Sequence, residues 1–96
     1  MRIDFHPDAT RELESSADWY AERSPDAARG FAIEIDAALK KIADQPERFP
    51  TIDGRHQACS VDRYPFQVVF RSDSGTVNVI AVAHAKRRPK YWLQRG

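Results

Sequence analysis

The sequence lacks the features that mark most secreted or membrane-spanning proteins. It has a single cysteine, Cys59, among 96 residues, so neither an internal disulfide bond nor a cluster of thiolate metal ligands can form. No apolar run reaches the roughly 18 residues that a membrane-spanning helix requires. The first eight residues hold two acids and a proline where a signal peptide would have an apolar core. We therefore expect a cytoplasmic protein.

Motifs for cofactors and metals are also absent from the sequence. The three histidines, His6, His56 and His84, are far apart, and none has a carboxylate at helical ligand spacing. The sequence contains neither a glycine-rich phosphate loop nor a nucleophile elbow. We expect neither a cofactor nor a bound metal.

What is present is a composition typical of one soluble domain with an uneven charge distribution. Hydrophobic residues make up 42% and charged residues 30% of the chain, and its length suits a single domain over residues 1–96. Residues 1–48 hold seven basic and eleven acidic side chains (net −4), whereas residues 49–96 hold eight and three (net +5). This asymmetry favours an anionic or acidic partner for the second half. Two solvated faces that neutralise each other explain it equally well.

The first half of the sequence predicts a short strand followed by a helical hairpin. Residues 2–5 alternate polar and apolar, and Pro7 is well placed as a first helical residue. Ser24 is a good N-cap for a second helix that begins at Pro25. Trp19 cannot share the apolar face of the first helix, so it is expected to point toward the other helix, the sheet or an interface, with a core role favoured. The two apolar stripes comprise Leu13, Ala17 and Tyr20, then Ala28, Phe31, Ile35, Leu39 and Ile42.

The second half predicts three strands. Residues 58–64 and 66–71 have strand patterns, and residues 72–75 form a good hairpin turn. Residues 77–83 are apolar on both faces except at one position, which is typical of a central strand covered on both sides. The expected fold class is α+β, in the order β-α-α-β-β-β. In this fold the N-terminal strand and the two-helix hairpin pack on an antiparallel sheet.

A basic, aromatic tail follows the last strand and holds the candidate functional residues. His84, at the strand end, could act as an acid or base in RNA cleavage, or could hydrogen-bond a neighbouring segment. Arg87 and Arg88 could bind phosphate or the acidic groups of a protein, or could be solvated. Tyr91 and Trp92 could stack on bases, meet a partner or fold back over the sheet. The tail has no acid, and its basic residues are Lys86, Arg87, Arg88, Lys90 and Arg95.

Several short phrases stand in a fixed order along the predicted elements. They are residues 17–20, 31–36 with Ile42, 46–50, 64–66, 81–84 and Tyr91-Trp92. Together with the element order, these phrases resemble the ParE/RelE superfamily of bacterial toxins from type II toxin–antitoxin modules. The likeness spans nearly the whole chain, and the order and spacing of the phrases make it fairly specific.

The resemblance implies a small toxin that is neutralised by a cognate antitoxin, whose flexible segment wraps the toxin surface. It also implies one of two targets, depending on the branch of the superfamily. ParE-like members inhibit DNA gyrase without known bond-making chemistry of their own, and RelE-like members cut messenger RNA in the ribosome.

The residues present favour the ParE branch. Metal-free RNA cleavage needs groups that deprotonate the 2′-hydroxyl, stabilise charge on the phosphorane and protonate the leaving oxygen. The resemblance implies that a RelE-type nuclease would supply these groups with strand lysines, two arginines and a late tyrosine. Gln67 and Ala85 stand where the arginines are expected, residues 58–61 offer no lysine, and only Tyr91 matches in type.

The sequence therefore predicts a ParE-like toxin that inhibits DNA gyrase by protein contact. It binds target or antitoxin through Arg87, Arg88, Tyr91 and Trp92, and could form a hetero-oligomer with the antitoxin. The alternative is a ribosome-dependent, metal-independent endoribonuclease that uses His84, Arg87 and Tyr91. A third reading is a binding module without toxicity. Direct binding of nucleic acid stays open.

Overall fold

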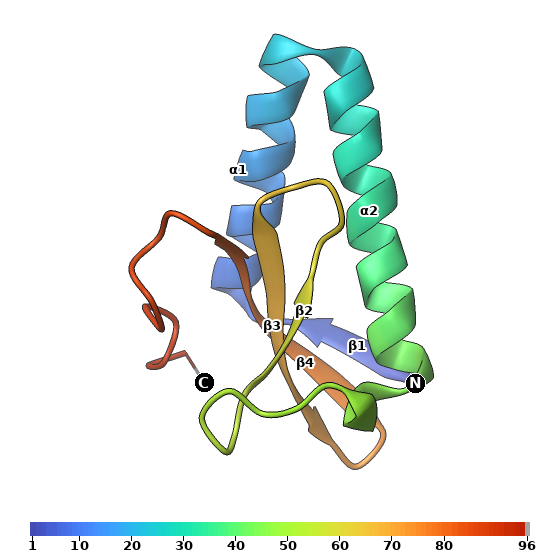
Figure 1. The fold of residues 1–96 in the computed structure, drawn as a ribbon, viewed down its shortest axis with the longest axis vertical. Coiled ribbons are helices and arrows are strands. Elements are labelled where there is room, and N and C mark those ends of the chain that lie inside the picture. Colours follow the sequence, from blue (N-terminus) through green and yellow to red (C-terminus); the bar gives the residue numbers. More distant parts are fainter. Residues whose placement is uncertain (96) are drawn as a thin grey trace.

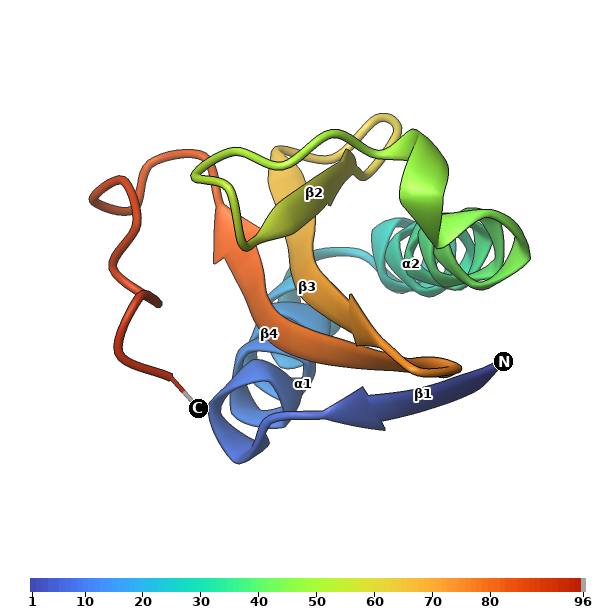
Figure 2. The ribbon, with the colours of Figure 1, turned by 90° about the horizontal axis from the view of Figure 1, so that it is seen from below.

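The computed structural model describes residues 1–95 as a helical hairpin on a four-stranded sheet (Figure 1). The described residues form an α+β fold in the expected order β-α-α-β-β-β. A strap of turns, here residues 85–95, follows the sheet on the side opposite α2 (Figures 1 and 2). The elements are β1 (Arg2–Phe5), α1 (Pro7–Arg23), α2 (Pro25–Asp44), the short 3-10 helix η1 (Pro46–Arg48), β2 (Gln57–Ser60), β3 (Phe66–Asp73) and β4 (Thr76–His84).

The two helices begin where the sequence predicts. His6 caps α1, because its Nδ1 accepts a hydrogen bond from the Asp8 amide at 3.0 Å, and Pro7 follows it. Ser24 serves both helices. Its backbone N–H donates to Tyr20 at the end of α1, and its hydroxyl accepts from the Ala27 amide at 3.2 Å to begin α2. One residue thus makes the hairpin corner without a connecting loop.

The predicted antiparallel sheet is formed by β2, β3 and β4, and β1 joins it to make a mixed sheet. The strand order is β1-β4-β3-β2, with β4–β3 and β3–β2 antiparallel. However, β1 joins the sheet beside β4 and runs parallel to it, with Phe5 opposite Val79. The hairpin α1–α2 lies between β1 and the other strands in sequence, and such a long connection permits a parallel pairing. Strand β4 is internal, as predicted for residues 77–83.

Strand β2 is shorter than the predicted strand over residues 58–64. It ends at Ser60, and the chain then turns through Arg63, whose φ is +69°. Pro65 has no N–H to donate to a ladder, and the Phe66 amide instead donates to the Tyr64 carbonyl at 2.8 Å. The β3–β4 turn is at the predicted place. Ser74 and Gly75 both have positive φ, as a tight two-residue hairpin requires.

The sheet buries apolar side chains on both faces. The face toward the helices carries Val68, Phe70, Val77, Val79 and Val82, and the first and largest core lies there. The opposite face carries a second, smaller core of Val69, Ile80, Ala81 and Ala83, covered by Trp92. An irregularity in the β3–β4 register between Val69 and Phe70 places Ile80 and Ala81 together in this second core. The strap therefore completes the fold.

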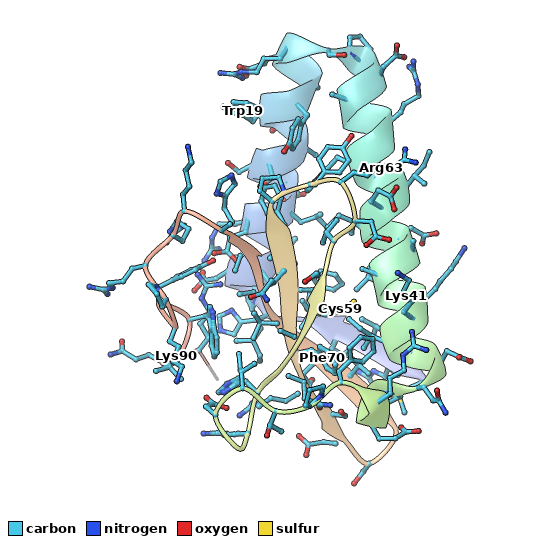
Figure 3. The ribbon with its side chains drawn as sticks, viewed as in Figure 1. Trp19, Lys41, Cys59, Arg63, Phe70 and Lys90 are labelled. Carbon is cyan, nitrogen blue, oxygen red and sulfur yellow. The ribbon has the colours of Figure 1, made fainter. Side chains whose placement is uncertain are left out.

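Trp19 lies on the surface, so the expected core role for its side chain is wrong. Its side chain is 52% exposed on α1, and the Arg23 guanidinium stacks 3.7 Å from the ring centroid (Figure 3). The core side of the helix is taken by Tyr20, whose ring lies beside Trp19 edge-on. Among residues 1–95, none of the helices is both long and apolar enough to cross a membrane.

Gly30 and Tyr64 make a tight contact that gives a first prediction. The Tyr64 hydroxyl donates to the Ala27 carbonyl at 2.9 Å, and a Cβ at Gly30 would overlap this hydroxyl. Gly30→Ala is therefore expected to lower the free energy of unfolding by about 1–3 kcal/mol through overpacking. In Tyr64→Phe the nearest ring atom would be 3.5 Å from that Cβ, an ordinary contact. There alanine should stabilise the helix by roughly 0.5–1 kcal/mol.

The effect of Gly30→Ala on stability should thus change sign between the parent and Tyr64→Phe. It is measured by urea unfolding of the two single variants, the double variant and the parent. Tyr64→Phe alone supplies the cost of the lost hydrogen bond, about 0.5–1.5 kcal/mol. If the two substitutions prove additive, the two groups do not compete for the same space, and the close approach of α2 to the loop after β2 is not as described.

Candidate functional site

The candidate residues lie at the end of β4 and in the strap. Successive turns shape the strap: the amides of Arg87, Tyr91 and Arg95 donate to the carbonyls three residues earlier, at 3.0–3.3 Å. Lys90, also in the strap, has a φ of +59°, which turns the chain back toward the sheet. The strap thus has a defined path rather than the extended form of a solvated tail.

His84 organises the first turn of the strap. Its Nδ1 accepts a hydrogen bond from the Lys86 amide at 3.0 Å, and its ring stands edge-on to Phe66 with centroids 4.9 Å apart. The ring is half-buried beside the start of β3, opposite Phe66 in the ladder. This is the arrangement of a histidine that hydrogen-bonds its neighbouring segment.

A carboxylate on α1, Glu12, gathers three groups from the far end of the chain. Its Oε2 accepts from the Tyr91 hydroxyl at 2.6 Å, and its two oxygens accept from the Arg95 guanidinium at 2.8 and 3.0 Å. Oε1 also accepts from the Val82 amide at 3.0 Å. The Glu12 and Arg95 side chains are only 14% and 15% exposed. We call Glu12, Tyr91 and Arg95 the latch.

The latch shifts the pKa values of its members in the directions that its contacts require. Burial alone would raise the pKa of Glu12, but the hydrogen bonds from Arg95, Tyr91 and the Val82 amide outweigh it and lower the pKa. Burial and the hydrogen bond to the Glu12 carboxylate raise the pKa of Tyr91 to about 12. Glu12 is thus held ionised and Tyr91 held neutral, as a donor to Glu12.

The Trp92 side chain is buried between the strap, to which it belongs, and the sheet. It is 4% exposed, covers the second core, and lies 4.7 Å from the ring of His56, centroid to centroid. His56 is itself 2% exposed, and its Nδ1 is 2.8 Å from Asp53 Oδ2. Hydrogen bonds from the His56 backbone and side chain keep the pKa of Asp53 well below its usual range. In this conformation the indole ring packs against the sheet, and only a small part of it borders the hollow beside the strap.

Four of the five basic residues of the strap face outward, Arg95 being the exception. Lys86, Arg87, Arg88 and Lys90 are all exposed, and we call these four the cationic ridge. The Arg87 guanidinium lies 4.0 Å from the centroid of the Tyr91 ring, which fixes one side of the ridge. The ridge borders an open hollow of about 550 Å³ whose floor includes Tyr64, Pro65, Gln67 and Ala83. Figure 3 shows Lys90 and, on the far side of the molecule, Lys41 of α2.

The structure brings the predicted site residues together in two different settings. Arg87 and Arg88 lie on the exposed ridge, and Tyr91 lies beneath it with its hydroxyl held by Glu12. Trp92 lies deeper, in the second core. Glu12 and Arg95 were missed as site residues. Nothing in the sequence distinguishes Glu12 from the other acids of α1, because its role depends on partners 70 to 83 residues away.

Comparisons with known proteins agree with the fold and its sequence pattern. Residues 3–89 match a family described as the ParE toxin of the type II toxin–antitoxin system, parDE. A solved structure described as the chromosomal ParDE TA system from P. aeruginosa is similar in fold, with a TM-score of 0.75 and 17% sequence identity. The match covers 90% of this chain and 97% of that chain. No curated protein is similar to the chain at a significant level.

Proposed function

The chain belongs to the ParE toxin family of type II toxin–antitoxin systems, and on that premise we propose that it inhibits DNA gyrase by protein contact and is neutralised by a cognate antitoxin. The observation that carries the proposal is the family match over residues 3–89. The proposed mechanism requires no bond-making step from this chain. It requires a surface on which a partner protein can dock.

The cationic ridge is the surface that we assign to this contact. Its four basic side chains are exposed, and the strap that presents them is fixed to the sheet by Trp92 and to α1 by Glu12. Because the backbone of the strap is ordered by its turns before binding, little loop freedom is lost on association. A partner segment rich in Asp and Glu matches this surface, since complementary charge accelerates association and fixes register.

The endoribonuclease alternative has less support from the site. A tyrosine that protonates a leaving group works best with a pKa near the ambient pH, and the pKa of Tyr91 is raised to about 12. Its hydroxyl is also engaged with Glu12. His84 and Arg87 hold the first turn of the strap and the Tyr91 ring respectively. These contacts are typical of structural roles.

Brief expression without antitoxin distinguishes gyrase inhibition from mRNA cleavage and from binding without toxicity. Supercoiling assays and mapping of transcript ends are made on the same induced cells. The proposal expects loss of gyrase activity and DNA damage without new transcript ends. Rapid codon-positioned mRNA cleavage that His84→Ala abolishes would overturn it, and normal growth of cells that contain folded protein would favour a binding module without toxicity.

Charge reversal tests the ridge itself. The double variant Arg87→Glu/Arg88→Glu is expected to slow association with the purified antitoxin by about tenfold or more and to reduce the salt dependence of the rate. The adjacent pair Lys40→Glu/Lys41→Glu on α2 is the matched control, because it makes the same change in net charge on exposed residues of the opposite side. Association rates are measured by surface plasmon resonance at two ionic strengths. Equal effects of the two double variants would show that net charge, and not the ridge, governs association.

A further inference from the structure

The edge of β4 changes partner halfway along its length. From Thr76 to Val79 the strand pairs with β1, and the His6 amide closes this pairing with a hydrogen bond to the Val79 carbonyl at 2.8 Å. Beyond that point β1 has ended and the chain turns into α1, as Figure 2 shows. The next stretch of the β4 edge is reached by side chains.

A carboxylate and a guanidinium take the place of a neighbouring strand there. Glu12 accepts from the Val82 amide at 3.0 Å, and Arg95 donates to the Ile80 carbonyl at 3.1 Å. These are the two kinds of hydrogen bond that a paired backbone would make. Because Glu12 and Arg95 also bind each other through both oxygens and both terminal nitrogens, they close the edge as a unit.

The same unit holds the end of the strap. Arg95 binds Glu12, so the described end of the strap lies against α1. Tyr91, four residues earlier, adds its hydroxyl to the same carboxylate at 2.6 Å. Asp8, one turn before Glu12 on α1, lies 3.7 Å from the Nε of Arg95 and adds a second negative charge. Strand β4 and two positions of the strap thus converge on one side chain of α1.

We propose that Glu12 is a positioning residue that latches the strap over the sheet. While the latch is closed, Trp92 stays buried, the β4 edge at Ile80 and Val82 stays sealed, and the cationic ridge keeps a fixed shape. When the Glu12 charge is removed, the largely shielded guanidinium of Arg95 loses its two-oxygen partner and the strap opens. The latch goes beyond the proposed function, because it is a property of the fold. Only its effect on partner binding rests on that function.

The latch is tested with Trp92 as a reporter. In a Trp19→Phe background Trp92 is the only tryptophan, and because it is 4% exposed its fluorescence should resist quenching by acrylamide. Glu12→Gln keeps the size of the side chain and removes its charge. Glu14→Gln, an exposed position on the same helix, is the matched control. We expect a severalfold increase in the quenching constant for Glu12→Gln and none for Glu14→Gln.

A second variant and a site-specific measurement distinguish opening of the latch from unfolding of the whole domain. Arg95→Ala breaks the latch from the strap side and should give the same increase in quenching. Amide hydrogen exchange should accelerate by about tenfold or more at Val82, whose amide binds Glu12, while the amide of Val68 in the internal strand β3 keeps its protection. If Trp92 remains shielded in both Glu12→Gln and Arg95→Ala, Glu12 does not hold the strap and the inference is overturned.

The pH profile of the reporter adds a readout that packing alone would not change. The pKa of Glu12 is lowered in the folded protein from its ordinary value of 4.5, so the latch is intact above that value and is lost as pH falls through the folded pKa. Quenching should therefore rise in acid in the parent and be flat there in Glu12→Gln. The other titratable and charged groups around Glu12 are Asp8 and Arg11 on α1, His84 on β4, and Arg87, Tyr91 and Arg95 in the strap. They remain in both proteins, so the difference isolates Glu12.

Partner binding is measured separately. If Glu12→Gln exposes Trp92 and also slows association with the antitoxin, the latch positions the ridge for its partner. If Trp92 is exposed but association is unchanged, the latch stands and the assignment of the ridge as the contact surface fails. The two proposals therefore fail by different outcomes.

Discussion

Phe31→Ala is expected to lower the free energy of unfolding by about 3–5 kcal/mol. Phe31 has no exposed surface and lies among the rings of Tyr20, Tyr64 and Phe66, with centroids 5.1, 5.5 and 5.2 Å away. These rings come from α1, the loop after β2, and β3, so one side chain joins both helices to the sheet. Truncation leaves a cavity that the surrounding rigid rings cannot fill.

The size of the loss is measured by urea unfolding followed by far-ultraviolet circular dichroism. Because a small domain has a total stability of roughly 5–15 kcal/mol, Phe31→Ala should leave a substantial unfolded population at physiological temperature. Ile33→Ala on the same helix is the control. Ile33 is 65% exposed, and its loss should change stability by no more than about 0.5 kcal/mol. Similar effects at the two positions would mean that α2 does not seat on the sheet through Phe31.

Local signals in the sequence were sufficient for the helical hairpin but not for the sheet. Ser24 and Pro25 define the corner, because an N-cap and a first-turn proline act within a few residues. The pairing of β1 with β4 joins residues more than 70 positions apart, and an alternating strand pattern does not say which neighbour or direction it takes. The early end of β2 depended on the backbone conformation of Arg63, which no residue preference predicts.

The candidate site was predicted as a segment, and its internal arrangement was not. Basic and aromatic residues in residues 85–95 marked the strap, but sequence cannot tell an aromatic ring that meets a partner from one that packs on a sheet. Trp92 is buried and Trp19 is 52% exposed, although both stand next to a tyrosine in the chain. Glu12 was not singled out in the sequence, because only the fold places it beside Tyr91 and Arg95.

Trp92→Ala is also expected to lower the free energy of unfolding strongly, and it tests whether the indole ring stabilises the fold or contacts a partner. The ring covers Val69, Ile80, Ala81 and Ala83, and its removal should cost about 3–5 kcal/mol if the strap unfolds together with the sheet. The outer face of the sheet would then be uncovered and His56 would lose its ring contact. We therefore expect a lower urea midpoint together with binding of a hydrophobic dye to the folded protein.

Leu93→Ala, one residue further along the strap, is the matched control because Leu93 is 47% exposed. It should leave both the urea midpoint and dye binding near those of the parent. A surface role for Trp92 makes the opposite prediction: full stability, no dye binding, and weaker association with antitoxin or gyrase. Since the ring is 4% exposed and lies against four core side chains, any loss of partner binding in Trp92→Ala should follow from loss of the folded strap. Binding should then fall in parallel with stability in Trp92→Ala and in the milder Trp92→Phe, because both act on the surface that supports the cationic ridge.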